Sequence, residues 1–192
     1  MTYAEYLHHS QQLLFGPDYP HPYENPAYLE YARLGLSRMK RWDKSMVLDA
    51  SLVNYIRAID QPQTWIVITE PWCGDAAPML PFIARLADEN PLITLDIQFR
   101  DLPPFLIEQY LTNGGKSIPK LIVRNSYGKD LFTWGPRPVS AQQLVQDLNA
   151  SGTEKSEVVL ALQNWYNDNK GDEMQQEWLR LFQTSLAPAS IK

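Results

Sequence analysis

The stretch TEPWCGDAAP, residues 69–78, contains the single cysteine of this 192-residue chain, Cys73. It follows TWIVIT, residues 64–69, a β-branched and aromatic run without alternation that predicts a strand buried on both faces. The next segment, Asp75–Asn90, carries apolar residues at helical spacing. We therefore expect Cys73 between the carboxyl end of a strand and the start of a helix, where open α/β sheets bind ligands.

This position has opposing effects on the thiol of Cys73. The free N–H groups and the dipole of a helix amino terminus favour the thiolate, which is the nucleophilic form. Glu70 and Asp75 act in the other direction, because nearby carboxylates disfavour a second negative charge. A lone cysteine is also commonly a small buried hydrophobe. The residues alone leave both interpretations open.

The following elements complete a sheet. LITLDIQF, residues 92–99, predicts a second strand, which makes a right-handed βαβ unit with the first. We expect a helix over Phe105–Leu111 and then a hairpin of Lys120–Arg124 and Asp130–Trp134. Ser140 and Gln143 form the pattern of a capping box for a helix over residues 141–148. The order predicts a mixed α/β sheet covered by helices on both faces.

Helical segments flank this sheet. Asn25 and Pro26 are a typical helix start, and Ser151 with Glu154 forms a further capping-box pattern. We predict an N-terminal helical extension over residues 1–48 and the sheet domain over residues 49–150. A C-terminal helical extension over residues 151–192 is expected to pack on the same domain.

The bulk composition narrows the classes of function. A net charge of −5 disfavours nucleic acid and anionic membranes as partners, since both need clustered cations. No apolar run reaches membrane-spanning length, and the N-terminus lacks the pattern of a signal peptide. One cysteine excludes an internal disulfide framework, so the expected location is the cytoplasm. We see no metal-ligand spacing in the sequence. The adjacent His8 and His9 would splay apart on a helix and would not chelate one metal ion well.

PWCGDA, residues 71–76, resembles the thioredoxin family, whose motif at this point of the fold is W-C-G-P-C. Pro81, the dipeptide Ile118-Pro119 and Gly135 match the proline of the active-site helix, the cis-proline pair and a glycine beside the groove. The segments EPWCGDA, RD, SIPK and WGPRP resemble uncharacterised single-cysteine members. The resemblance runs from about Tyr28 to Phe182. It implies a thioredoxin-like three-layer α/β/α sandwich with a mixed central sheet.

The departures from the family pattern concern activity. Ala76 stands where the resolving cysteine is expected, Asp75 replaces the intervening proline, and Val67 replaces a buried acid. A dithiol protein releases its mixed disulfide through its own second thiol, at a high effective concentration. The resemblance therefore implies that turnover here needs an external thiol, such as glutathione or another low-molecular-weight thiol, and no resident cofactor.

The hairpin supplies further candidates for a substrate groove. Its last strand is expected to end at the same edge of the sheet as the thiol, so that Trp134 and Arg137 border the groove. We expect Arg137 to offer positive charge to the thiolate or to a bound carboxylate. The alternative is a surface arginine that packs on Trp134. The candidate groove residues are Trp72, Gly74, Asp75, Ala76, Ile118, Pro119, Trp134, Gly135 and Arg137.

Two functions of different classes remain. The first is monothiol exchange, in which Cys73 is the nucleophile toward protein thiols or disulfides and Ile118-Pro119 aligns the substrate. The second is a binding module that keeps the groove for an extended peptide but has lost redox activity. Metal or cluster binding through Cys73 is a third and less supported interpretation. The reactivity of Cys73 separates an enzyme from a module.

Overall fold

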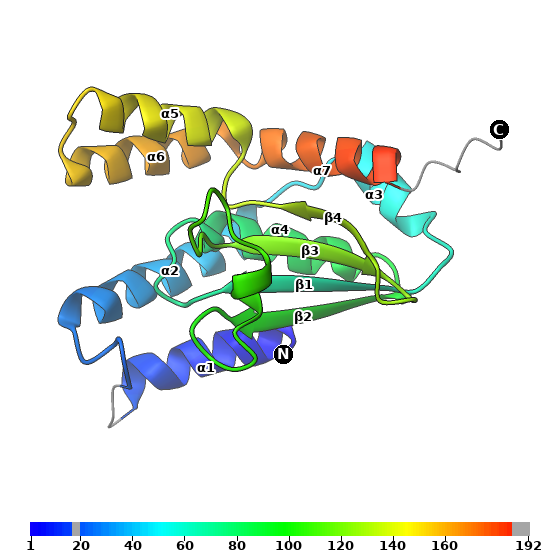
Figure 1. Ribbon diagram of the computed structural model, residues 1–192, viewed down its shortest axis with the longest axis horizontal. Coiled ribbons are helices and arrows are strands. Elements are labelled where there is room, and N and C mark those ends of the chain that lie inside the picture. The colour runs from blue at the N-terminus through cyan, green and yellow to red at the C-terminus, as the bar shows by residue number, and fades with distance from the viewer. Residues whose placement is uncertain (17–19, 186–192) are drawn as a thin grey trace.

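The computed structural model describes residues 1–16 and 20–185 (Figure 1). Its sheet has the strand order β2-β1-β3-β4. Strand β1 is parallel to β2 and antiparallel to β3, which is antiparallel to β4. The mixed sheet and its hairpin agree with the prediction, and each strand begins and ends within one residue of the expected bounds. The strands are β1 (Gln63–Thr69), β2 (Ile93–Phe99), β3 (Lys120–Asn125) and β4 (Asp130–Trp134).

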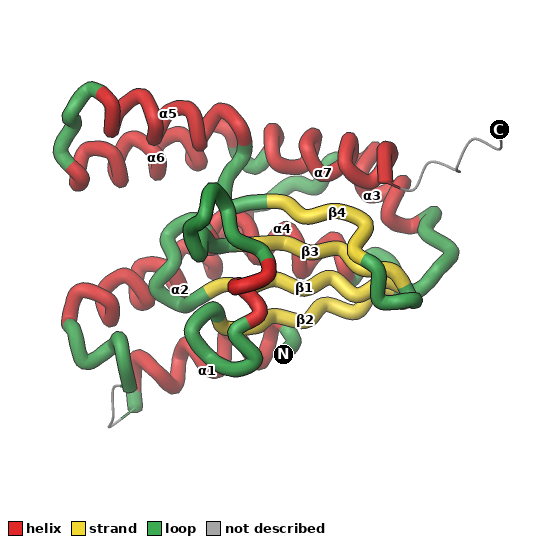
Figure 2. Tube along the Cα trace, in the orientation of Figure 1, coloured by secondary structure: helices red, strands yellow, loops and turns green. Residues whose placement is uncertain are grey.

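The helices lie before, between and after these strands (Figure 2). Helix α2 begins as predicted, because the Asn25 side chain accepts a hydrogen bond from the amide of Ala27 at 3.0 Å and Pro26 is the first helical residue. The α-helices are α1 (Tyr3–Phe15), α2 (Pro26–Ser45), α3 (Ala50–Arg57), α4 (Ala76–Ala87), α5 (Val139–Ala150), α6 (Lys155–Asn169) and α7 (Asp172–Ser185).

One face of the sheet packs on helices. Trp65, Val123 and Phe132 are register partners on neighbouring strands, so their side chains share this face. The Phe182 ring of α7 lies 5.3 Å from the Trp65 ring and 4.9 Å from the Phe132 ring, between centroids. In Figure 1, helix α4 lies behind the sheet and α7 lies above it, beyond β4. The core is therefore an aromatic and aliphatic layer between this face and the helices.

The other face is covered by the segment of residues 100–119, which crosses in front of the sheet in Figures 1 and 2. The helix expected over Phe105–Leu111 is instead a short 3₁₀-helix, η1 (Leu106–Gln109). Phe105 is in the left-handed region with a φ of 55° and Tyr110 has a φ of −130°, so only the four residues between them are helical. Ile107 in η1 of this segment is fully buried and joins the hydrophobic core.

The two predicted capping boxes of the C-terminal half are wrong: Ser140 with Gln143, and Ser151 with Glu154. The backbone amide of Ser140 donates to the carboxylate of Glu173 at 2.8 Å, and its hydroxyl bonds the same group. The hydroxyl of Ser151 donates to the carbonyl of Leu148 at 2.8 Å. A tertiary partner and the end of the preceding helix therefore use the hydroxyls that the local pattern assigned to caps.

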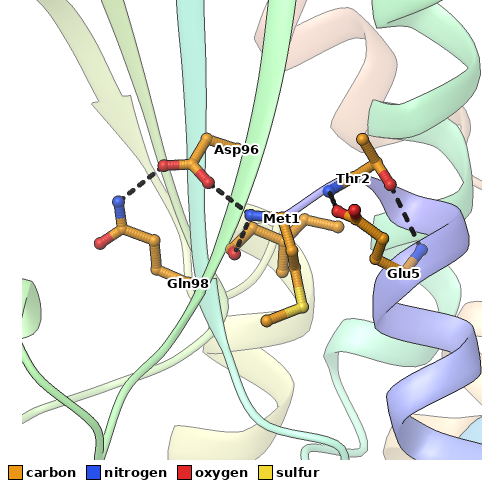
Figure 3. Close-up of polar contacts among 6 residues, drawn as sticks. Met1, Thr2, Glu5, Asp96 and Gln98 are labelled. Atoms are coloured by element: carbon orange, nitrogen blue, oxygen red, sulfur yellow. Dashed lines mark hydrogen bonds and ion pairs between the residues drawn. The ribbon is translucent and has the colours of Figure 1, made fainter.

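The N-terminal segment is attached to the edge strand β2 (Figure 3). The nitrogen of Met1 donates to Asp96 at 2.6 Å and to the carbonyl of Ile97 at 3.0 Å. Thr2 and Glu5 then form a capping box that starts α1. These contacts place α1 beside the sheet.

Candidate functional site

Cys73 lies in the turn between β1 and α4, where the sequence places it. Its side chain is 5% exposed, and the thiol donates a hydrogen bond to the carbonyl of Ile118 at 3.4 Å. The peptide bond between Ile118 and Pro119 is cis. The thiol therefore faces the backbone that immediately precedes β3.

The surroundings of Cys73 favour its protonated form. Burial, and to a smaller degree the nearby Asp75 carboxylate, raise the pKa of the thiol to about 12. The backbone amides of Ala76 and Asp75 and the charge of Arg137 act in the opposite direction, with smaller effects. The opposing influences that the sequence left open are thus decided by burial, and the folded protein holds a neutral thiol at pH 7.

Asp75 connects three parts of the chain. Its Oδ2 lies 2.6 Å from Nη2 of Arg137, and its Oδ1 accepts a hydrogen bond from the hydroxyl of Tyr166 at 2.9 Å. Arg137 also bonds the side chain of Gln142 at 3.3 Å. The turn that carries the thiol is therefore joined to the segment after β4 and to α6. Tyr166 was not predicted from the sequence, because no local pattern connects it with a residue 91 positions earlier.

Arg137 and Trp134 have different surroundings. The guanidinium of Arg137 pairs with Asp75, as described above, and lines the same cavity as the thiol. Trp134 turns toward α7: its ring lies 5.2 Å from that of Trp178, and its Nε1 donates to Glu177 at 2.6 Å. Of the two residues expected at the groove, Arg137 lies at the thiol and Trp134 packs against the C-terminal helix.

A cavity of about 250 Å³ opens beside the thiol. Three cations surround it: Arg100, Lys116 and Arg137. Arg100 lies over the Trp72 ring, with 4.7 Å between its guanidinium carbon and the ring centroid. The first two cations were not assigned to the site from the sequence, although the dipeptide that contains Arg100 is part of the family resemblance. The lining residues are Trp72, Cys73, Gly74, Asp75, Arg100, Lys116, Ser117, Ile118, Pro136 and Arg137.

The remaining candidate groove residues, Ala76, Pro119 and Gly135, are not among the residues that line this cavity. Ala76 is fully buried in the first turn of α4, and Pro119 is buried at the start of β3. Gly135 lies against the backbone of Pro119. Glu70 is buried just before the thiol turn, and its carboxylate accepts a hydrogen bond from the amide of Asp101 at 3.0 Å. Burial raises the pKa of Glu70 to about 7.

Within residues 1–16 and 20–185, no group of three or more His, Cys, Asp or Glu side chains is placed to hold a metal ion. In the same described residues, no helix combines the length and the apolar character needed to cross a bilayer.

A mixed sheet with flanking helices, and a cysteine between the first strand and the next helix, define a thioredoxin-like α/β protein. Residues 23–149 match the family model described as Thioredoxin, so the chain belongs to the thioredoxin family. No curated protein matches the sequence.

Solved structures share the fold. A protein of unknown function from Pseudomonas aeruginosa, determined at 1.5 Å, is 16% identical with a TM-score of 0.56, over 96% of this chain and 92% of that one. An HIV epitope-scaffold is 18% identical with a TM-score of 0.55, over 96% of this chain and 99% of that one. At these identities the likeness concerns the fold alone.

Proposed function

We propose that this thioredoxin-family protein is a binding module, which receives an extended segment of a partner protein beside Ile118-Pro119 and uses Cys73 as a neutral hydrogen-bond donor. The observation that carries the proposal is the hydrogen bond from the thiol of Cys73 to the carbonyl of Ile118, made by a side chain that is almost fully buried. A thiol that donates is protonated, whereas the nucleophile of thiol–disulfide exchange is the thiolate.

The residue at the resolving position supports the same function. Ala76 is fully buried and has no sulfur, and Cys73 is the chain's single cysteine. A mixed disulfide at Cys73 would therefore have no internal thiol to release it. Burial of the thiol disfavours the first half-reaction of a dithiol exchange, the attack on a disulfide. The second half-reaction, release by a resolving cysteine, is disfavoured because the chain has no second cysteine.

The groove retains features that recognise a partner. Ser117 and Ile118 line the cavity just before β3, a position that suits an extended segment that adds its own main-chain hydrogen bonds. Arg100, Lys116 and Arg137 surround the same cavity. Each of them is paired with an acid of this chain, Asp101, Glu108 and Asp75 in turn, and their remaining donors favour a partner segment that carries Asp, Glu or a terminal carboxylate.

Monothiol exchange is the second candidate, and one observation favours it. The amides of Asp75 and Ala76 and the charge of Arg137 all stabilise a thiolate at Cys73. In this reaction the thiolate attacks a disulfide of the substrate, a new S–S bond forms, and one substrate sulfur leaves as a thiolate. Glutathione or another small thiol then attacks the mixed disulfide, which releases the reduced substrate and leaves Cys73 joined to the small thiol until a second equivalent frees it.

Alkylation of Cys73 by iodoacetamide across pH 6–10 separates the two functions. For a binding module we expect the folded protein to react about 100-fold more slowly at pH 7.5 than the same chain unfolded in guanidinium chloride, because few thiolates are present even though each is more nucleophilic. The rate is expected to rise with pH without a plateau. A plateau below pH 8 contradicts the module and supports exchange. Cys73→Ser is the control for labelling elsewhere.

A further inference from the structure

A second cavity lies on the far side of the ion pair between Asp75 and Arg137. It has a volume of about 270 Å³ and lies between α2 and α6. It shares Trp72, Gly74, Asp75 and Arg137 with the thiol cavity, but the thiol of Cys73 does not line it. Its other lining residues are Tyr31, Leu34, Arg38, Lys155, Val159, Leu162, Gln163 and Tyr166.

The walls of this α2–α6 cavity are largely apolar although they face solvent. Tyr31 and Leu34 of α2 are 49% and 40% exposed, and Val159 of α6 is 50% exposed. Apolar side chains from two helices that converge on one cavity are typical of a ligand site, where a few polar groups set the orientation.

The polar groups of the α2–α6 cavity are mainly cationic. Arg38 on α2 and Lys155 on α6 stand on opposite walls, and within residues 1–16 and 20–185 neither has an acidic partner. Arg38 is half-buried, and burial lowers its pKa. The one acid in the lining, Asp75, is already bound by Arg137 and Tyr166. A half-buried cation without a counter-ion is stabilised by a bound anion.

We propose that the α2–α6 cavity binds a small amphipathic organic anion: a carboxylate near Arg38 and Lys155, with an apolar body between Leu34 and Val159. The volume lies just below the range of drug-sized ligand pockets, which suits a single short or medium acyl chain. The cations of this cavity favour an anion over a neutral or cationic ligand, although the net charge of the whole chain is −5. The site does not depend on Cys73, and Cys73→Ser retains it.

Calorimetric titration tests the proposal with two ligands of equal chain length, decanoate and decyltrimethylammonium, both below their micellar concentrations. We expect one decanoate to bind per chain, and the cation to bind at least tenfold more weakly. Arg38→Gln is expected to weaken decanoate binding about tenfold, the loss of one charged contact. Lys40→Gln changes an exposed cation of the same helix outside the cavity and is expected to leave the affinity unchanged.

A second pair of variants tests the apolar wall. Val159 lines the cavity, whereas its neighbour Leu160 is 62% exposed outside it. Val159→Asp places a negative charge in the site and is expected to abolish decanoate binding, while Leu160→Asp retains it. Circular dichroism checks that both variants fold. The proposal is overturned if wild-type protein does not bind decanoate, if the cation binds equally well, or if the members of either pair of variants behave alike.

Discussion

The carboxylate of Asp75 lies 2.6 Å from the guanidinium of Arg137, and this ion pair separates the thiol cavity from the α2–α6 cavity. The two members act with opposite sign on Cys73: Asp75 raises the pKa of the thiol, and Arg137 lowers it.

Asp75→Asn is expected to make Cys73 more reactive. The variant removes a negative charge beside the thiol and leaves Arg137 free to stabilise the thiolate, while the amide oxygen still accepts the hydrogen bond of Tyr166. We expect the rate of alkylation by iodoacetamide at pH 8 to rise about threefold for a fall of about one pKa unit, because a less basic thiolate is also less nucleophilic.

Arg137→Gln is the matched opposite of Asp75→Asn. It removes the cation and leaves the carboxylate unpaired, so the alkylation rate at pH 8 is expected to fall below that of the wild type. If both variants shift the rate in the same direction, the ion pair does not control the thiol electrostatically.

Glu70 is expected to make the fold less stable as the pH rises. Its pKa is about 7 in the folded protein against an ordinary value of 4.5, because burial disfavours the carboxylate. Between these values the unfolded chain ionises first. The free energy of unfolding therefore falls as the pH rises from 4.5 to 7, and the loss is complete above pH 7.

Glu70→Gln isolates this effect, because its amide oxygen can still accept the hydrogen bond from Asp101. Urea unfolding at pH 8 is expected to show the variant more stable than the wild type, by up to about 3 kcal/mol. This difference shrinks toward pH 4, where the wild-type side chain is neutral in both states. A stability difference that does not change with pH contradicts the shifted pKa.

The sheet could be predicted from the sequence because its signals are local. The β-branched run at residues 64–69 and the turn at residues 125–128 lie within single windows, and the structure contains both the strand and the hairpin. The helix expected over Phe105–Leu111 was wrong, because Phe105 takes a left-handed conformation and Tyr110 leaves the helical region, and no sequence pattern at these positions indicates either.

The candidate site was predicted only in part, because its partners are chosen by tertiary contact. The position of Cys73 opposite Ile118 followed from the family resemblance. No pattern in the sequence connects Asp75 with Tyr166, or turns Trp134 toward α7 instead of the groove. The pKa of a thiol beside both a helix start and a carboxylate depends on burial, which a sequence pattern does not supply.

Glu177 is expected to hold α7 to the end of β4. Its two carboxylate oxygens accept hydrogen bonds from Nε1 of Trp134 at 2.6 Å and from the amide of Val139 at 2.8 Å, and its side chain is buried. Glu177→Ala leaves both donors without this partner, so we expect urea unfolding to show a loss of about 3 kcal/mol. Glu173→Ala, one turn earlier and only half-buried, removes the acceptor of two surface hydrogen bonds from Ser140 and is expected to cost about 1 kcal/mol. Equal losses for the two variants would show that the hydrogen bonds of the buried Glu177 stabilise the fold no more than those of Glu173.

Gly135→Ala is expected to be the most damaging single-methyl change near the site. Gly135 has a φ of 114°, which L side chains rarely adopt, and an added Cβ would overlap the carbonyl oxygen of Pro119. Because that atom is backbone, relief requires a shift of the strand start behind the thiol cavity, and we expect a loss of at least about 3 kcal/mol in urea unfolding. Gly128→Ala is the control, since its φ of 78° is also positive but its Cβ meets open space, so a loss of about 1 kcal/mol is expected. Losses of the same size would mean that the backbone conformation alone, and not the contact with Pro119, requires glycine at position 135.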